Sequence, residues 1–213
     1  MAEALRLQNQ DDALGKARRR QIFLAACRVL ATKSFHEATV KEMALEAGLA
    51  AGSIYIYLQS KDEILLLLAE SMVGELVDAL PAIRSEAGDD PRRELLGIMR
   101  AALDVIDRYR EAFAVLNHEV RYLEQRPEYR AALKEIIHPY RLALGDPLER
   151  GRALGLISFE SLPSAVEALH MLCSGWAMGG SLLAKTEKET YWREIAAIVG
   201  GRFFKSSGGA DKA

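Results

Sequence analysis

The chain has 213 residues, half of them hydrophobic, which is enough for one large domain or two small ones with an ordinary core. It contains no run of 18 or more apolar residues and no N-terminal apolar stretch typical of a signal peptide, so we expect a cytoplasmic protein with no membrane partner. The net charge is −2, but it is unevenly distributed. Residues 13–61 contain eight Lys and Arg and three Glu, a net charge of +5, so the rest of the chain carries −7. This asymmetry favours contact of residues 13–61 alone with a polyanion.

The N-terminal part of the chain begins with a predicted disordered segment and a long helix. We expect residues 1–12 to be disordered and a helix to run from about Leu14 to Lys33. The evidence for this helix is a single apolar face with three- and four-residue spacing. That face consists of Ile22, Ala25, Ala26, Val29 and Leu30.

Two short helices follow. Thr39 and Glu42 have the spacing of a capping box, in which each side chain bonds to the backbone amide of the other. Gly48 suits the left-handed position that ends a helix, and a second helix is predicted from about Ala50 to Leu58, with Ile54 on its buried face. Two such helices have the dimensions of a helix-turn-helix, although a small helical corner with no DNA role has them too.

A long helix is predicted next. Residues 60–63 form a second apparent capping box, so we expect this helix to continue to about Ala79 and to end at Pro81. Asp90 followed by Pro91 predicts the start of another helix, which extends to about Arg108.

The C-terminal half is also predicted to be helical. A helix is expected over about 111–125, and a longer helix begins at Pro127. Pro139 should kink or break this longer helix, and the turn signal at 145–147 should end it. Further helices are expected over 164–185 and 188–204, before a mobile tail at 206–213. Because no segment has strand periodicity, the fold class is all-α with about nine helices.

Catalytic chemistry finds no support in the sequence. There is no glycine-rich phosphate loop, no nucleophile elbow and no His-x-x-x-His spacing, so we expect no catalytic residue, metal or cofactor. Cys27 and Cys173 lie far apart in apolar helical patterns and are interpreted as reduced core thiols.

The stretch from Ile22 to Leu68 resembles the DNA-binding region of the TetR family of transcriptional regulators. Two positions depart from the family pattern: Ser34 stands where Gly is usual, and Ala50 where Ser or Thr often caps the second short helix. The resemblance is carried by Ile22, Ala25, Ala26, Thr39, Met43, Ala44, Ala47-Gly48-Leu49, Ile54-Tyr55-Ile56-Tyr57-Leu58 and Lys61-Asp62.

The resemblance implies a helix-turn-helix at about 39–58 within a DNA-binding domain at 16–76. Its second helix would enter the major groove of double-stranded operator DNA with the small residues Ala50, Ala51, Gly52 and Ser53, assisted by Lys41. The phosphate contacts implied by the match are Thr39, Tyr55, Tyr57 and Lys61, with Arg18 and Arg19 as additions. The alternatives are core packing for Tyr55 and a solvated cap for Lys61.

The resemblance also implies that residues 77–205 bind a small-molecule effector and form a homodimer. For the dimer interface we expect small and apolar residues of the last two helices. They are Ala168, Leu172, Gly175, Gly179, Ile195 and Val199. For the effector we expect an apolar pocket with few polar points, which suits an apolar or amphipathic molecule. Its candidate residues are Phe113, Asn117, Tyr140, His170, Trp176 and Met178.

The most specific function that these features favour is a ligand-responsive repressor. It would bind a palindromic operator as a dimer and leave it when the effector binds. An activator of the same fold is an alternative, and so is a helical adaptor that does not bind DNA.

Overall fold

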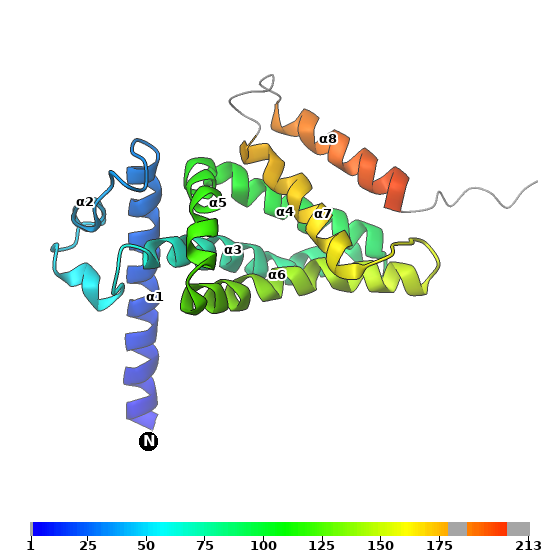
Figure 1. Ribbon diagram of the computed structural model, residues 1–213. Helices are drawn as coiled ribbons and strands as arrows, with labels where there is room; N and C mark the ends of the chain where they lie inside the picture. Colours follow the sequence, from blue (N-terminus) through cyan, green and yellow to red (C-terminus); the bar gives the residue numbers. More distant parts are fainter. Residues whose placement is uncertain (1, 179–186, 204–213) are drawn as a thin grey trace, which may run out of the picture. The chain divides into compact units, whose positions relative to one another are not determined.

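The computed structural model describes the backbone of residues 2–178 and 187–203, and the side chains of residues 13–177 and 187–201. Within these ranges the chain forms eight α-helices and two short helical segments, and no strand (Figure 1). The predicted all-α class is therefore confirmed. The elements are α1 (Ala2–Leu30), α2 (Val40–Glu46), the 3-10 helix η1 (Ser53–Ile56), α3 (Glu63–Ala87), α4 (Pro91–Arg108), α5 (Arg110–Glu124), α6 (Pro127–Ala153), α7 (Leu162–Met178), α8 (Lys188–Ile198) and the π-helix η2 (Val199–Phe203).

The chain divides into two compact units, each made of two separate stretches. Unit 1 comprises Met1–Ser71 and Tyr109–Ile136, and unit 2 comprises Met72–Arg108 and Ile137–Ala213. This division differs from the predicted boundary at 76/77, because α5 and the first part of α6 belong to unit 1. Local sequence patterns do not show which distant segment a helix will pack against.

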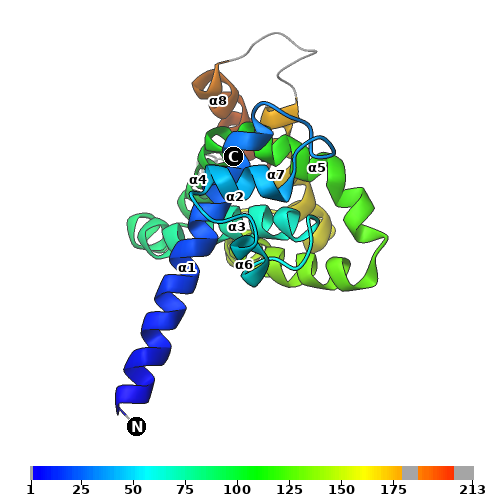
Figure 2. The same ribbon diagram turned by 90° about the vertical axis from the view of Figure 1, so that its left-hand side faces the viewer.

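In unit 1, α1 packs against α2 and α5, and α2 lies beside α1 in both ribbon views (Figures 1 and 2). The apolar stripe of α1 forms the centre of this unit, since Ile22 and Phe23 are completely buried. Phe23 meets the Tyr109 ring edge-on at a centroid distance of 4.8 Å. Met43 and Ile54 are also fully buried, so both short helices are attached to the core through one face.

In unit 2, α7 packs against α4 and α8. Polar contacts reinforce this packing, because Trp176 Nε1 donates to Asp107 Oδ1 at 2.9 Å. The Glu94 carboxylate is only 2% exposed and is paired with Arg84 and Arg150. A buried carboxylate needs such partners, since an unpaired charge in the interior is strongly unfavourable.

Most helix boundaries agree with the predictions, but the first helix does not. It begins at Ala2 rather than near Leu14, so the expected disorder of residues 1–12 is not what the structure has. Ala, Leu, Arg, Gln and Glu are abundant in this stretch, and these residues favour helix intrinsically. The tail at 206–213 lies outside the described residues.

Three prolines lie inside helices where a turn or a break was predicted. α3 continues through Pro81 to Ala87, and α6 continues through Pro139 and Pro147 to Ala153, so the predicted turn at 145–147 is wrong. Each proline removes one helical hydrogen bond. Burial of leucines near Pro81 and Pro147 compensates for that loss. They are Leu76 and Leu80 before Pro81, and Leu144 and Leu148 on either side of Pro147.

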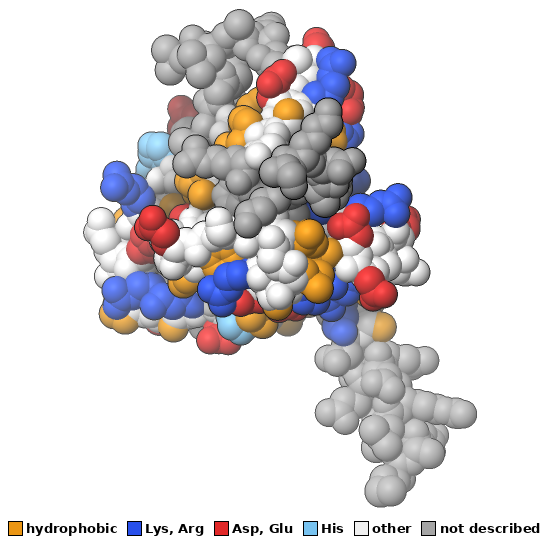
Figure 3. All heavy atoms as spheres, turned by 90° about the vertical axis from the view of Figure 1, so that its right-hand side faces the viewer, with side chains coloured by type: hydrophobic (Ala, Val, Ile, Leu, Met, Phe, Trp, Pro, Cys, Tyr) orange, Lys and Arg blue, Asp and Glu red, His pale blue; other side chains and the backbone are white. Residues whose placement is uncertain are grey.

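Among the described residues, no helix combines the length and apolar character that crossing a membrane requires. Figure 3 shows hydrophobic side chains reaching the surface between charged ones on the face that it draws.

Candidate functional site

The start of α2 is fixed by the predicted capping box, which the structure confirms. Glu42 N donates to Thr39 Oγ1 at 3.2 Å, and Thr39 N donates to Glu42 Oε2 at 2.9 Å. Lys33 also pairs with the Glu42 carboxylate. Hydrogen bonds from Lys33 and then from Thr39 lower the pKa of Glu42 from 4.5 to about 2. The Thr39 hydroxyl, the Thr39 amide and the Lys33 ammonium therefore all stabilise the N-terminus of α2.

The turn between α1 and α2 is made without the glycine that was expected at position 34. The Ser34 hydroxyl donates to Glu37 Oε2 at 2.8 Å, and the Ser34 amide donates to the same oxygen at 3.2 Å. These two bonds, from the hydroxyl first, lower the pKa of Glu37. A side-chain acceptor thus replaces the backbone freedom of glycine at this turn.

The turn after α2 has the predicted left-handed glycine. Gly48 has φ of 66°, a conformation that costs residues with a Cβ free energy. Leu49 N donates to Ala44 O at 2.8 Å, which closes the end of α2. The Gln21 amide of α1 donates to Ala47 O, so the first helix holds the turn in place.

The segment expected to enter the groove is shorter than predicted. Instead of a helix from about Ala50 to Leu58, the structure has one 3-10 turn, Ser53–Ile56, preceded by Gly52 without a side-chain cap. This follows from the missing Ser or Thr at position 50, because the first helical amides then lack a capping acceptor. Ile54 and Leu58 are buried as expected and attach the turn to the core.

The solvent face of this turn carries large side chains. Tyr55 is 56% exposed, so its interpretation as a core residue is wrong, and Ile56 is 78% exposed. The sequence analysis named Ile54 as the buried isoleucine of this segment, and it gave the exposed Ile56 no functional role. Among the small residues expected at the groove, Ala50 and Gly52 are exposed, whereas Ala51 and Ser53 are half-buried.

The basic side chains expected at phosphate have partners within the protein. Arg19 pairs with Glu70 and donates to Tyr57 O at 3.2 Å. Arg18 donates to Gln21 Oε1 at 2.9 Å. Lys61 Nζ donates to His36 O at 3.1 Å and lies 4.8 Å from the centre of the Phe35 ring.

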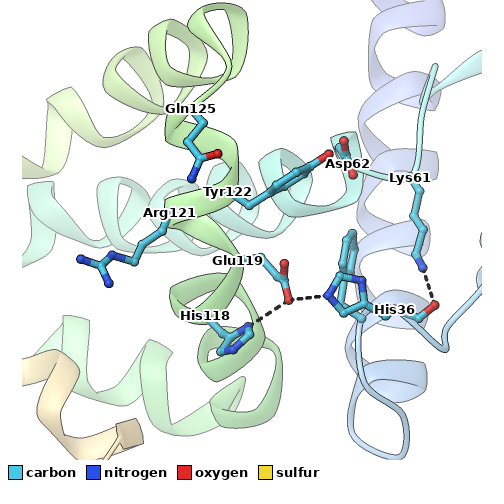
Figure 4. Close-up of a pocket in the computed structure, with 9 residues that line it drawn as sticks. His36, Lys61, Asp62, His118, Glu119, Arg121, Tyr122 and Gln125 are labelled. Atoms are coloured by element: carbon cyan, nitrogen blue, oxygen red, sulfur yellow. Dashed lines mark hydrogen bonds and ion pairs between the residues drawn. The ribbon is translucent and has the colours of Figure 1, made fainter.

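Lys61 also lines a pocket of about 440 Å³ within unit 1 (Figure 4). At its centre Glu119, 7% exposed, lies between two histidines, 3.0 Å from His118 Nδ1 and 3.5 Å from His36 Nε2. The sequence analysis assigned no role to these three residues. Glu119 gives one signal that was missed, since it is a carboxylate between Leu116 and Leu123 on the apolar stripe of α5. No described group of His, Cys, Asp and Glu has a metal-binding arrangement.

Two of the expected effector residues meet inside unit 2. The Tyr140 ring of α6 and the His170 ring of α7 pack edge-on with centroids 5.6 Å apart. Among the described residues, the Tyr140 hydroxyl and His170 Nδ1 are buried without a hydrogen-bond partner. Burial raises the pKa of Tyr140 and lowers that of His170, so both side chains are neutral near pH 7.

The other expected effector residues come from both units. Phe113 and Asn117 belong to unit 1, where the Asn117 amide nitrogen is buried without a partner among the described residues. Trp176 belongs to unit 2, where its indole is bonded to Asp107. The side chain of Met178 lies outside the described residues. The effector-binding role of all six residues stays a prediction.

The residues expected at a dimer interface fall into two groups. Ile195 and Val199 are buried within a single chain, so they are not available to a partner's surface. Ala168 is exposed, Leu172 and Gly175 are half-buried, and Gly179 lies outside the described residues. The same two helices expose Met171 (48%) and Ile198 (46%).

Comparison with known proteins identifies related sequences for the N-terminal part. Residues 22–68 match the family model for bacterial regulatory proteins, tetR family. Over 60 residues, 28% of this chain, the sequence is 35% identical to the fatty acid metabolism regulator protein of Bacillus subtilis (strain 168), of which the match covers 31%. Over 87 residues, 41% of this chain, it is 33% identical to the HTH-type transcriptional regulator BetI of Stenotrophomonas maltophilia (strain R551-3), of which it covers 44%.

A solved structure is similar over most of the chain. The transcriptional regulator FadR from Bacillus subtilis in complex with stearoyl-CoA has a TM-score of 0.69 and 20% identity, over 84% of this chain and 96% of that one. At this identity the similarity concerns the fold alone. The sequence matches span less than half of the length of both curated relatives named above.

Proposed function

Because the chain belongs to the TetR family of bacterial regulatory proteins, we propose that it is a ligand-responsive transcriptional repressor. It binds a palindromic DNA operator as a homodimer and releases it when a small molecule binds its C-terminal helices. The relative described as a fatty acid metabolism regulator, and the similar structure that holds stearoyl-CoA, support an effector with a large apolar part.

The observation that carries the DNA-binding proposal is the turn at Ser53–Ile56. Buried Ile54 fixes the turn to the core, while Tyr55 and Ile56 project into solvent, and Lys41 of α2 is exposed as well. An exposed tyrosine followed by an exposed isoleucine offers apolar surface that a partner can cover. In the proposed complex Tyr55 contacts phosphate and the small residues at 50–53 contact thymine methyl groups in the major groove.

The homodimer is proposed on two grounds. One helix-turn-helix covers a single half-site, so specific binding requires two of them one helical turn of DNA apart. In addition, exposed Met171 on α7 and Ile198 on α8 are the kind of apolar surface that a second copy would bury. The proposed interface therefore consists of Ala168, Met171, Leu172 and Ile198.

An activator remains the second candidate for the regulatory outcome, since repressors and activators share the DNA contacts described here. A reporter gene placed behind the selected operator distinguishes them. Deletion of the regulator raises expression if it is a repressor and lowers expression if it is an activator.

The test is selection of bound sequences from random double-stranded DNA, followed by titrations at graded salt. We expect an inverted repeat and an affinity that falls steeply with salt. Lys61→Ala should weaken binding to all sequences alike and reduce the slope of log K against log salt by about 1.

Two variants separate the charge of Lys61 from its bond to His36. Lys61→Arg keeps the charge and should keep the slope, and Lys134→Ala, an exposed lysine of α6, should leave it unchanged. Recovery of no sequence from the selection contradicts the DNA-binding proposal. A changed sequence preference in Lys61→Ala contradicts its phosphate role.

A further inference from the structure

We infer that Tyr140 and His170 form the polar end of the effector site, and that the effector there is a largely apolar molecule with one uncharged oxygen that accepts a hydrogen bond, such as a ketone or an ester carbonyl. This inference rests on the proposed function, because it names the chemistry of the ligand to which the repressor responds.

The first observation is that two buried polar atoms lie together without partners. Tyr140 is 7% exposed, and neither its hydroxyl nor His170 Nδ1 has a hydrogen-bond partner among the described residues. The other imidazole nitrogen of His170 is satisfied, since Nε2 lies 3.3 Å from Ser174 Oγ. Buried polar groups in native proteins nearly always have partners, so an exception in one place indicates a missing partner.

The second observation is the contrast with another tyrosine of the same unit. Tyr191 donates its hydroxyl proton to Leu172 O at 2.7 Å, although its side chain is less deeply buried than that of Tyr140. The chain thus supplies an acceptor where the need is smaller and supplies none to Tyr140. A ligand oxygen would accept the Tyr140 proton.

The surroundings define the rest of the ligand. Buried apolar side chains lie on the same helices as the pair, one turn away on each. They are Leu144 on α6 and Val166 and Cys173 on α7. The two helices approach closely, since a Cβ at Gly145 would lie 4.0 Å from Val166 Cγ2. Such a lining favours an apolar body for the ligand.

Charge excludes ionised ligands from this position. Arg141 and Glu167, one from each helix, pair with each other at 2.9 Å and leave no net charge to balance a buried carboxylate or ammonium. Both rings are neutral near pH 7, because burial moves the pKa of Tyr140 up and that of His170 down. An uncharged acceptor therefore matches the site better than a free fatty acid or a quaternary amine.

The first test measures thermal stability without any ligand. Replacing Tyr140 by Phe removes an unsatisfied hydroxyl and should raise the melting temperature by about 2–4 °C. The matched control Tyr191→Phe removes a satisfied hydroxyl and should lower it by a similar amount. A Tyr140→Phe protein that melts at or below the wild-type temperature overturns the inference, because the hydroxyl then has a partner in the free protein.

The second test measures binding of three probes of similar chain length by calorimetry: 2-undecanone, undecanoate and decyltrimethylammonium. The ketone should bind best, and Tyr140→Phe should weaken it roughly 2- to 12-fold while Tyr191→Phe does not. Absence of ketone binding, tighter binding of either ion, or ketone binding unchanged in Tyr140→Phe overturns the inference.

Neither measurement uses DNA, so the inference about the ligand site and the proposal of DNA binding can each fail without the other. Failure of the DNA selection with success here removes the repressor function and leaves the ligand site. Success of the selection with failure here leaves a repressor whose effector is recognised by other residues.

Discussion

Single residues decide how the N-terminal part of the chain is held together. The Thr39 hydroxyl, the Thr39 amide and the Lys33 ammonium all donate to the Glu42 carboxylate, and these bonds favour its ionised form. Because the folded protein lowers the pKa of Glu42 to about 2 from 4.5, protonation of this group is coupled to unfolding.

The pH dependence of this coupling has a definite sign. A depressed folded pKa contributes stability above the unfolded value of 4.5, and that contribution is lost as the pH falls toward 2. The difference in unfolding free energy between wild type and Glu42→Gln should thus be constant above about pH 5.5 and shrink between pH 4.5 and 2. Urea denaturation at each pH measures it, and a difference that stays constant down to pH 2 would show that the charge plays no part.

Residue chemistry was also the part of the site best predicted from the sequence. Thr39 with Glu42, Gly48, and Asp90 before Pro91 act over one helical turn, so their spacing alone identifies them. Ser60 shows the limit of this argument. It has capping-box spacing to Glu63, yet Glu63 accepts from Gln59 N and the Ser60 hydroxyl lies 3.1 Å from the Tyr129 hydroxyl of α6. A partner 69 positions away cannot be found from spacing.

At the scale of elements, two glycines differ in how much their positions require glycine. Gly48 lies in the turn after α2, and Gly52 directly precedes η1. Gly48 has φ of 66°, whereas Gly52 has φ of −77° and open space around its Cβ position. An alanine at 52 fits the same backbone and reduces the freedom of the unfolded chain, but an alanine at 48 is strained.

We therefore expect opposite effects from the same substitution. Gly52→Ala should raise the free energy of unfolding by about 0.4–1 kcal/mol. Gly48→Ala should lower it by about 1–2 kcal/mol. Equilibrium unfolding in urea measures both. Destabilisation by Gly52→Ala would mean that residue 52 leaves the helical region of φ and ψ in solution.

Helix ends were predicted less well than helix existence, for a physical reason. Proline costs a helix one hydrogen bond and roughly 3 kcal/mol, and a sequence argument counts only this cost. Burial of Leu76 and Leu80 before Pro81, and of Leu144 and Leu148 around Pro147, outweighs it. The opposite error occurred at Ala50, where the absence of a cap was noted but a full helix was still expected.

At the scale of the whole molecule, we expect two copies of the chain to form a dimer in solution. Twice the chain mass of 23.5 kDa, about 47 kDa, is expected in sedimentation equilibrium. Met171→Glu and Ile198→Glu place a charge on the proposed interface, so both should shift the mass toward 23.5 kDa and weaken operator binding. Leu142→Glu makes the same change at a leucine of α6 that is 51% exposed, and it should leave the dimer intact.

If the wild-type protein is monomeric, the dimer proposal is contradicted. If Leu142→Glu dissociates the dimer, the interface lies on another face of the chain. The interface predicted from the sequence stays a prediction, but two of its residues, Ile195 and Val199, are buried within the chain. Long-range packing decides between these outcomes.

The helices that pass from one unit to the other are α3 and α6, and both contain prolines in their interior. Without an amide hydrogen at Pro81 and Pro139, the carbonyls of Val77 and Glu135 lack the usual hydrogen bond from the residue four positions later. Bending stiffness is lowest where such a bond is missing. Pro81 and Pro139 are therefore the positions at which α3 and α6 bend most easily.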